Sequence, residues 1–264
     1  MTSTNTFPYA LVAGGSTGIG FSVAEALARR KYNLILVGRD PGRLLNVKTI
    51  LESSHSIHVE TLVYDLSKHE SVAEIATWCA EKKIQLTMLC NVASLGGEKD
   101  YLTLPLESLR FMIDLNFTSC ISLCLTLLPL LEKNAPSFIL NVGSVAGYAP
   151  IPSKNLYSAT KSAVTFFSYS LRYQLKGKGI SVSCLTPGPV FTKESIEKDT
   201  RKRLGWFGVQ MAVDQSKVGE IAVRDTLRGK LIITPGTLAK TVVFFMRILP
   251  ARFLAFLDYK AGRK

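Results

Sequence analysis

The chain has 264 residues, of which 47% are hydrophobic and 20% charged, and its formal net charge is +12. Its length and apolar content are sufficient for a buried core and exclude intrinsic disorder, while 5 cysteines are too few for a disulfide scaffold. The charge is uneven: residues 1–192 hold 17 basic and 13 acidic side chains, and residues 193–264 hold 15 and 7. Any surface for a polyanion is therefore expected in the last quarter of the chain.

Strand-length apolar segments alternate with helix-length amphipathic segments along most of the chain. The expected strands are Tyr9–Ala13, Asn33–Val37, His58–Tyr64, Leu86–Cys90, Ser137–Val142, Ser181–Leu185 and Leu231–Thr234. The expected helices lie near 18–31, 41–53, 70–82, 107–133, 157–176 and 216–228. This alternation predicts an α/β fold, a single doubly wound domain whose seven-stranded parallel sheet has helices on both faces.

Neither the N-terminus nor the cysteines suggest export or metal binding. Residues 1–6 are polar and carry no signal-peptide pattern, which favours a cytoplasmic protein. The cysteines lack His or Cys partners at metal-ligand spacing, so we expect reduced core thiols and no metal. They are Cys79, Cys90, Cys120, Cys124 and Cys184.

A glycine-rich turn follows the first expected strand. It reads Ala13-Gly14-Gly15-Ser16-Thr17-Gly18-Ile19-Gly20, with a helix expected to begin near Gly18. Glycines there permit a tight turn and close approach of the backbone to a pyrophosphate, which the N–H groups of the helix N-terminus bind. Such a turn can also be purely structural, so its position between a strand and a helix carries the interpretation.

The spacing G-x-x-x-G-x-G resembles that of the short-chain dehydrogenase/reductase family, whose motif is T-G-x-x-x-G-x-G with Ala tolerated first. The resemblance implies a Rossmann fold and a dinucleotide cofactor. In this turn, the implied cofactor-binding residues are Gly14, Ser16, Thr17, Gly18, Ile19 and Gly20.

Arg39 follows the second expected strand, where family members that prefer NADP carry Arg. A cation at this position suits the 2′-phosphate of NADP(H), whereas NAD requires a carboxylate for the ribose hydroxyl. Asp40 is interpreted as the cap of the helix that opens at Pro41. A surface arginine in a turn is the alternative reading of Arg39.

Further matches to the family follow the third, fourth and sixth strands. Asp65 and Leu66 match its adenine contact, and Asn91 and Ala93 match two positions of its V-N-N-A-G sequence. Val92 and Ser94 depart from it; loss of the second Asn removes a hydrogen bond that steadies the central strands, and Ser is less permissive than Gly. The segment after the sixth strand matches the family's P-G-x-x-x-T, with a simple turn as the alternative. It implies cofactor contacts from Pro187, Gly188, Val190 and Thr192.

Three residues near the fifth strand form a candidate catalytic set. Ser144 follows the strand, and Tyr157 and Lys161 form a Y-x-x-x-K pair on one face of an expected helix. A free phenol has a pKa near 10, and a neighbouring cation lowers it toward neutral pH. Asn116 matches the family's fourth catalytic position. Taken singly, each residue has a structural alternative: a cap, a surface pair or a buried amide.

The resemblance implies a role for each of the four. Tyr157 donates a proton to a carbonyl oxygen or takes one from a hydroxyl, and Ser144 holds that oxygen. Lys161 lowers the phenol pKa and binds the nicotinamide ribose, while Asn116 anchors a water that links Lys161 to solvent. Tyr157 and Lys161 are thus also cofactor-binding residues.

The C-terminal quarter carries the expectations about substrate and partners. Residues 1–236 form the cofactor-binding and catalytic domain, within which 193–215 are a substrate lid whose Trp206, Phe207 and Met211 favour an apolar substrate. Residues 237–264 form an amphipathic extension. It binds an inner membrane surface through residues 241–257, or packs on its own domain or a second subunit.

The leading functional hypothesis is an NADPH-dependent reductase of an apolar lipid-like or alicyclic carbonyl, or the reverse alcohol dehydrogenase. The alternative is a catalytically silent NADP-binding regulatory or scaffold protein. Nucleic acid is not expected as a partner, because no recognition motif accompanies the basic residues. The helices at 107–133 and 157–176 resemble the family's dimer-forming pair and imply a homodimer or homotetramer. Substrate identity and reaction direction are left open.

Overall fold

A computed structural model describes residues 7–96, 101–190 and 212–261. One parallel sheet lies at its centre, with seven strands in the order β3-β2-β1-β4-β5-β6-β7. The strands are β1 Tyr9–Ala13, β2 Asn33–Gly38, β3 Val59–Val63, β4 Leu86–Asn91, β5 Ser137–Val142, β6 Ile180–Leu185 and β7 Ile232–Ile233. The predicted doubly wound fold is confirmed, although β7 is shorter than the expected Leu231–Thr234.

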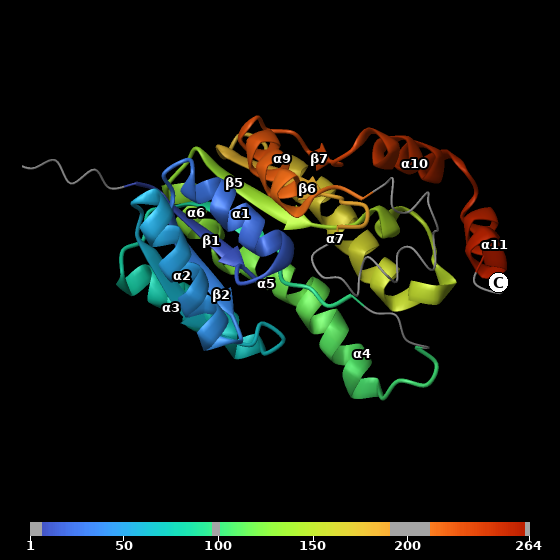
Figure 1. Ribbon diagram of the computed structural model, residues 1–264, viewed down its shortest axis with the longest axis horizontal. Helices are drawn as coiled ribbons and strands as arrows, with labels where there is room; N and C mark the ends of the chain where they lie inside the picture. The colour runs from blue at the N-terminus through green and yellow to red at the C-terminus, as the bar shows by residue number, and fades with distance from the viewer. Residues whose placement is uncertain (1–6, 97–100, 191–211, 262–264) are drawn as a thin grey trace, which may run out of the picture.

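Helices connect the strands and cover both faces of the sheet (Figure 1). They are α1 Gly18–Ala28, α2 Pro41–His55, α3 His69–Glu81, α4 Leu106–Ile113, α5 Ser119–Thr126, α6 Leu128–Lys133, α7 Asn155–Gln174, α9 Gln215–Leu227, α10 Thr237–Ile248 and α11 Ala251–Ala261. Short helical turns are the π turn η1 Asp114–Thr118 and the 3₁₀ turns η2 Val145–Tyr148 and η3 Pro152–Lys154.

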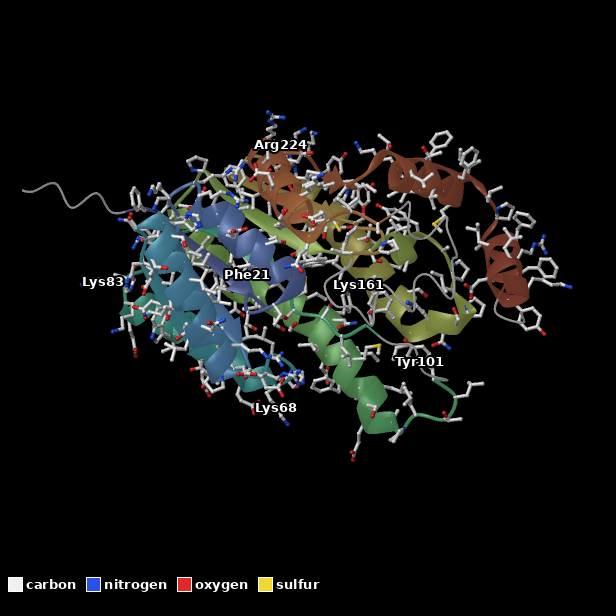
Figure 2. The ribbon with its side chains drawn as sticks, in the orientation of Figure 1. Phe21, Lys68, Lys83, Tyr101, Lys161 and Arg224 are labelled. Carbon is white, nitrogen blue, oxygen red and sulfur yellow. The ribbon has the colours of Figure 1, made fainter. Side chains whose placement is uncertain are left out.

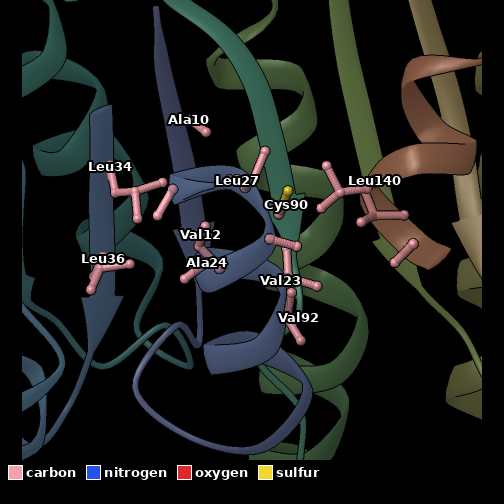
Figure 3. Close-up of a cluster of buried hydrophobic side chains, with 14 of the residues drawn as sticks. Ala10, Val12, Val23, Ala24, Leu27, Leu34, Leu36, Cys90, Val92 and Leu140 are labelled. Atoms are coloured by element: carbon pink, nitrogen blue, oxygen red, sulfur yellow. The ribbon is translucent and has the colours of Figure 1, made fainter. Parts of the chain in front are cut away.

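The core has two halves, one on each face of the sheet. Since strand side chains alternate, Ala10 and Val12 face the side covered by α1, α2 and α9 (Figure 3). Leu11 and Ala13 face the other side, where α3, α5 and α7 contribute apolar residues. The sheet is therefore buried on both faces, and its carboxyl edge remains for polar side chains.

The helix expected over 107–133 has four parts. The π turn lies between α4 and α5 within one continuous helix, and α6 begins at Leu128 because Pro129 cannot donate the hydrogen bond that would continue α5. By length and composition alone, Leu106–Thr126 is the one helix of the described chain that could cross a membrane. Leu115, Leu123 and Cys124 pack in the core against the sheet, as in a core helix of a domain.

The five cysteines are free and buried, as expected from their apolar surroundings. Burial raises the pKa of Cys79 to about 12, so this thiol stays protonated at neutral pH. No group of His, Cys, Asp and Glu that could hold a metal ion occurs among the residues described.

Candidate active site

The glycine turn between β1 and α1 is packed so closely that side chains are excluded. Gly14 has φ +85°, and its N–H donates to the Val37 carbonyl at 2.8 Å. A Cβ on Gly14 would lie 2.7 Å from the backbone of Ala93, and one on Gly20 would lie 1.9 Å from the Gly14 carbonyl oxygen. The turn thus depends on glycine at both positions.

The N-terminus of α1 is available to an anion. The helix begins at Gly18, and the capping residue Thr17 makes no side-chain cap hydrogen bond. The first N–H groups of the helix consequently lack a side-chain acceptor, as a pyrophosphate site requires. Ser16 is half-buried and Thr17 exposed beside them, while Ile19 packs partly against the core.

Arg39 lies exposed just beyond the end of β2. Its guanidinium carbon is 5.4 Å from the ring centroid of Phe111 on α4, a cation–π distance. Asp40 does not neutralise it: the carboxylate accepts the Arg43 N–H at 3.0 Å as the cap of α2 and pairs with the Arg43 guanidinium. A cation and an open helix N-terminus at one sheet edge fit a dinucleotide that carries an additional phosphate.

Asp65 and Leu66 lie in the turn after β3. The Asp65 carboxylate accepts hydrogen bonds from the backbone N–H and the hydroxyl of Ser67, at 3.0 and 2.8 Å. Leu66 is buried in the core below α3. The turn at the proposed adenine position is therefore held by hydrogen bonds, two of which are accepted by one carboxylate oxygen of Asp65.

Asn91 joins the two central strands of the catalytic half. Its Nδ2 donates to Asn141 Oδ1 at 2.8 Å, and Asn141 Nδ2 donates to Ser168 Oγ on α7 at 3.0 Å. The expected loss of a steadying hydrogen bond at Val92 is thus accompanied by another side-chain link between β4 and β5, and Val92 is a buried core residue. Ala93 is half-buried, and its N–H donates to the Ala13 carbonyl at 2.7 Å.

Ser144, Tyr157 and Lys161 come together where β5 ends and α7 begins. Ser144 is buried and its hydroxyl accepts the Ala146 N–H at 3.1 Å, which starts η2. Lys161 is only 2% exposed and lies in the interior (Figure 2). Its Nζ donates to the Val142 carbonyl at 2.8 Å and lies 5.9 Å from the Tyr157 ring centroid.

Burial dominates the protonation of the pair. It lowers the pKa of Lys161 to about 8, because the charged ammonium is removed from water. The pKa of Tyr157 is raised, with burial as the largest cause; the hydrogen bond with Ser144 opposes the rise and Tyr101 adds to it. Lys161 is not among the causes of this shift, so its expected effect on the phenol pKa stays a prediction.

Asn116 lies in the π turn and joins this turn to two neighbouring segments by hydrogen bonds. It accepts the Leu95 N–H at 2.7 Å, donates to the Leu95 carbonyl at 2.9 Å, and donates to Thr160 Oγ1 at 3.3 Å. It also lines a small pocket of about 10 Å³ with Asn91 and Cys120, which is close to the volume that holds one water. The geometry places Asn116 as a link between the β4 loop and the catalytic helix.

The segment after β6 returns to the catalytic serine. The Pro187 carbonyl accepts the Val145 N–H at 3.0 Å, Gly188 is half-buried, and Val190 is buried in the core. Thr192 and the expected lid residues from 193 to 211 lie outside the described chain. Pro187 therefore lies beside the residue that follows Ser144, and the cofactor contacts expected from Gly188 and Val190 stay predictions.

Three residues of the site have no signature in the sequence. The Phe111 ring contacts the Arg39 guanidinium, and Thr160 Oγ1 accepts a hydrogen bond from Asn116. Tyr101 raises the pKa of Tyr157. Thr160 lies inside the Y-x-x-x-K segment and could have been found as its fourth residue, directly before Lys161. Phe111 and Tyr101 are aromatic residues in a region without motif spacing, and only the fold brings them to the site.

Comparison with known proteins indicates the same family over most of the chain. The short chain dehydrogenase family profile matches residues 8–203. An uncharacterized oxidoreductase of Staphylococcus saprophyticus is 30% identical over 81% of this chain and 88% of its own length. The very-long-chain 3-oxoacyl-CoA reductase-A of Danio rerio is 34% identical over 70% of this chain, which spans only 59% of that protein.

A solved structure extends the likeness beyond the matched profile. The short-chain dehydrogenase from Sphingobium yanoikuyae in complex with NADPH has a TM-score of 0.77 at 27% identity, over 97% of this chain and 94% of that one. Its fold, the glycine turn and the Ser144–Tyr157–Lys161 arrangement agree with the profile match. The chain is an oxidoreductase and belongs to the short chain dehydrogenase family.

Proposed function

We propose that this chain is an NADPH-dependent oxidoreductase that reduces a carbonyl group, or oxidises a secondary alcohol, on an apolar lipid-like or alicyclic substrate. The observation that carries the proposal is the meeting of Ser144, Tyr157 and buried Lys161 at the carboxyl edge of the sheet, beside an open helix N-terminus. A silent scaffold would have no need of a buried lysine, whose desolvation destabilises the fold.

In this proposal the nicotinamide supplies or accepts a hydride, and the protein handles the proton. The Tyr157 hydroxyl gives its proton to the carbonyl oxygen as negative charge develops there. The Ser144 hydroxyl, which interacts with the phenol, donates a hydrogen bond to the same oxygen and fixes its position. The Lys161 ammonium is held by Val142 close to the phenol ring and stabilises the anionic phenolate after transfer.

NADP(H) is favoured as the cofactor by Arg39. The side chain is exposed and has no carboxylate partner among the residues described, so a 2′-phosphate can take that place. The turn residues from Gly14 to Gly20 and the α1 N-terminus would receive the pyrophosphate. The Sphingobium relative, solved with NADPH, supports the same choice.

An apolar substrate is favoured by the Danio relative, which is named as a very-long-chain 3-oxoacyl-CoA reductase.

We further propose a cytoplasmic homodimer or homotetramer, supported by exposed apolar side chains on the outer sides of α4 and α7. These are Leu106, Ile113, Phe166 and Tyr173. The membrane surface as a partner is argued separately below.

The test is NADPH oxidation with a panel of 3-ketoacyl thioesters, keto-steroids, quinones and small aldehydes. The wild-type chain should turn over at least one apolar carbonyl, and Tyr157→Phe should reduce its kcat by about 10²- to 10⁴-fold while NADPH binding is retained. Unchanged turnover by Tyr157→Phe would remove Tyr157 from the mechanism. NADPH binding without turnover across the panel would favour the silent scaffold.

A further inference from the structure

The two C-terminal helices are packed against the segment that joins Ser144 to Tyr157. The inner side of α10 contributes Ala239 and Val243 to a small apolar cluster with Val145, the first residue after Ser144. On α11, the Asp258 carboxylate accepts hydrogen bonds from the N–H and hydroxyl of Ser153, at 3.2 and 3.0 Å. Both helices therefore rest on the two 3₁₀ turns that lie between the catalytic serine and tyrosine.

The outer sides of the same helices expose large apolar side chains. Those more than 40% exposed are Phe244 (60%), Phe245 (54%), Ile248 (64%), Phe253 (45%), Phe256 (52%), Leu257 (46%) and Tyr259 (46%). We call these seven residues the outer apolar surface. Exposing so many large apolar side chains on two successive helices is unfavourable in water, and an exposed apolar surface of this kind marks a binding site.

Basic side chains surround the outer apolar surface. Lys240, Arg247, Arg252 and Lys260 are exposed on α10 and α11, and Lys260 lies 5.6 Å from the Phe256 ring centroid. Asp258 is the single acidic residue of Thr237–Ala261, and it is turned inward to Ser153. The charge facing outward is thus entirely positive over the described part of the two helices.

We infer that the outer apolar surface of α10 and α11 docks on an anionic lipid membrane. Phenylalanine and leucine side chains between cationic residues match the boundary between acyl chains and anionic headgroups, where amphipathic helices lie flat. A second protein copy would meet the same four cations with its own, and this repulsion favours lipid as the occupant.

Docking in this way fixes the position of the active site relative to the lipid. The helices lie at the end of the molecule opposite α2 and α3 (Figure 1), and they contact the turns that flank Ser144 and Tyr157. The catalytic segment is therefore held against the membrane, where an apolar substrate dissolves. Membrane binding itself does not require activity, whereas this delivery of substrate rests on the proposed function.

Vesicle flotation of the full chain tests the inference. Vesicles of phosphatidylcholine with phosphatidylserine should bind the protein, and vesicles of phosphatidylcholine alone should bind it about tenfold less. The double variant Phe244→Ser with Phe245→Ser should lower binding to the mixed vesicles about tenfold, because it removes two membrane-facing aromatic rings. Its matched control is Leu45→Ser with Ile50→Ser, which removes exposed apolar side chains from α2.

A charge variant separates electrostatic from apolar attraction. Arg247→Glu with Arg252→Glu should lower binding about tenfold or more, and Lys82→Glu with Lys83→Glu, at the exposed end of α3, should leave it unchanged. Circular dichroism and size-exclusion chromatography of each variant check folding and mass. Tyr157→Phe should bind vesicles as the wild type does, so a failed activity assay and a failed docking assay are distinguishable.

Three results would overturn the inference. The first is that the folded wild-type chain does not float with vesicles of either composition. The second is an equal loss of binding in the α2 control variant. The third is an oligomer that Phe244→Ser with Phe245→Ser converts to a smaller species, since this would assign the outer apolar surface to another copy of the chain.

Discussion

The two halves of the sheet differ in whether the polar groups of their sites are exposed or buried. In the nucleotide half, around β1, β2 and β3, the interior is apolar and the polar groups meant for a ligand, such as Arg39 and the α1 N-terminus, are exposed. In the catalytic half, around β4, β5 and β6, polar side chains are buried and bonded to one another: Asn91 to Asn141, Asn141 to Ser168, and Lys161 to Val142.

From this difference we infer which substitutions should change the stability of the fold and which should change ligand binding. A buried polar network loses free energy of folding when any member is removed, because its partners remain buried without hydrogen bonds. An exposed cation that waits for a phosphate can be removed with little effect on folding. Substitutions of the buried polar side chains in the catalytic half should therefore change stability, and substitution of the exposed Arg39 in the nucleotide half should change ligand affinity alone.

The largest expected effect is that of Asn141→Leu. It removes the acceptor of Asn91 Nδ2 and the donor to Ser168 Oγ, which then keep only Cys124 Sγ and the Val164 carbonyl as partners. Two buried polar groups that each lose a hydrogen bond cost about 4 kcal/mol of unfolding free energy. Urea denaturation measures the loss. Asn134→Ala, which removes a single bond to the Leu130 carbonyl at a helix end, is the control and should lose about 1 kcal/mol. An equal loss in both variants would contradict the network.

The charge on buried Lys161 should appear as a pH-dependent stability. Its pKa is lowered by burial from the ordinary 10.5 to about 8, so between these pH values the unfolded chain holds a proton that the folded chain has released. The contribution of Lys161 to stability is therefore unfavourable below pH 8 and improves as pH rises to 10.5. The stability advantage of Lys161→Met over the wild type should shrink by about 3 kcal/mol across that window.

Denaturation of the wild type and of Lys161→Met in parallel at each pH provides the measurement. Cysteine and tyrosine side chains titrate in both proteins, so their contributions cancel in the difference between the two unfolding free energies. A stability difference that does not vary with pH would show that folding does not lower the pKa of Lys161. Such a result would break the comparison at its buried cation, since the ammonium would then keep its ordinary pKa inside the catalytic half.

Arg39→Ala tests the nucleotide half. Loss of a charge-assisted contact to the 2′-phosphate should weaken NADPH binding by about 10- to 100-fold while NADH binding and unfolding free energy hardly change. Fluorescence titration with both nucleotides measures the ratio. Arg43→Ala, which removes a neighbouring guanidinium paired with Asp40, is the control. A similar loss for NADPH and NADH would remove Arg39 from cofactor selection.

Phe111→Leu is expected to have the smallest effect. The ring supports the Arg39 guanidinium at 5.4 Å, and an exposed cation–π contact is worth about 0.5–1 kcal/mol, so NADPH affinity should fall by about two- to fivefold. Phe111→Tyr keeps the aromatic face and should bind NADPH as the wild type does. If the leucine and tyrosine variants were alike, the ring would have no role in positioning Arg39.

Sequence patterns were sufficient for the sheet because its strands are continuous apolar runs, which only a covered parallel sheet buries on both faces. They were also sufficient to place Asp40 as a helix cap and the cysteines in the core. Patterns could not give the balance of effects on Tyr157, because its burial and its charge interaction with Tyr101 involve residues that only the fold brings together. They did not reveal the π turn at Asn116 either, since Asp114–Thr118 contains no proline or glycine to mark an irregular turn.

That π turn places Asn116 without disturbing the helices on either side of it. It lies between Phe111, which meets Arg39, and Leu123, which packs on the sheet. An i→i+5 turn holds one residue more than an α turn, so the extra residue is taken up inside Asp114–Thr118 and the two helices keep their faces. Asn116 can thus bond Leu95 and Thr160 while α4 stays beside Arg39 and α5 stays on the sheet.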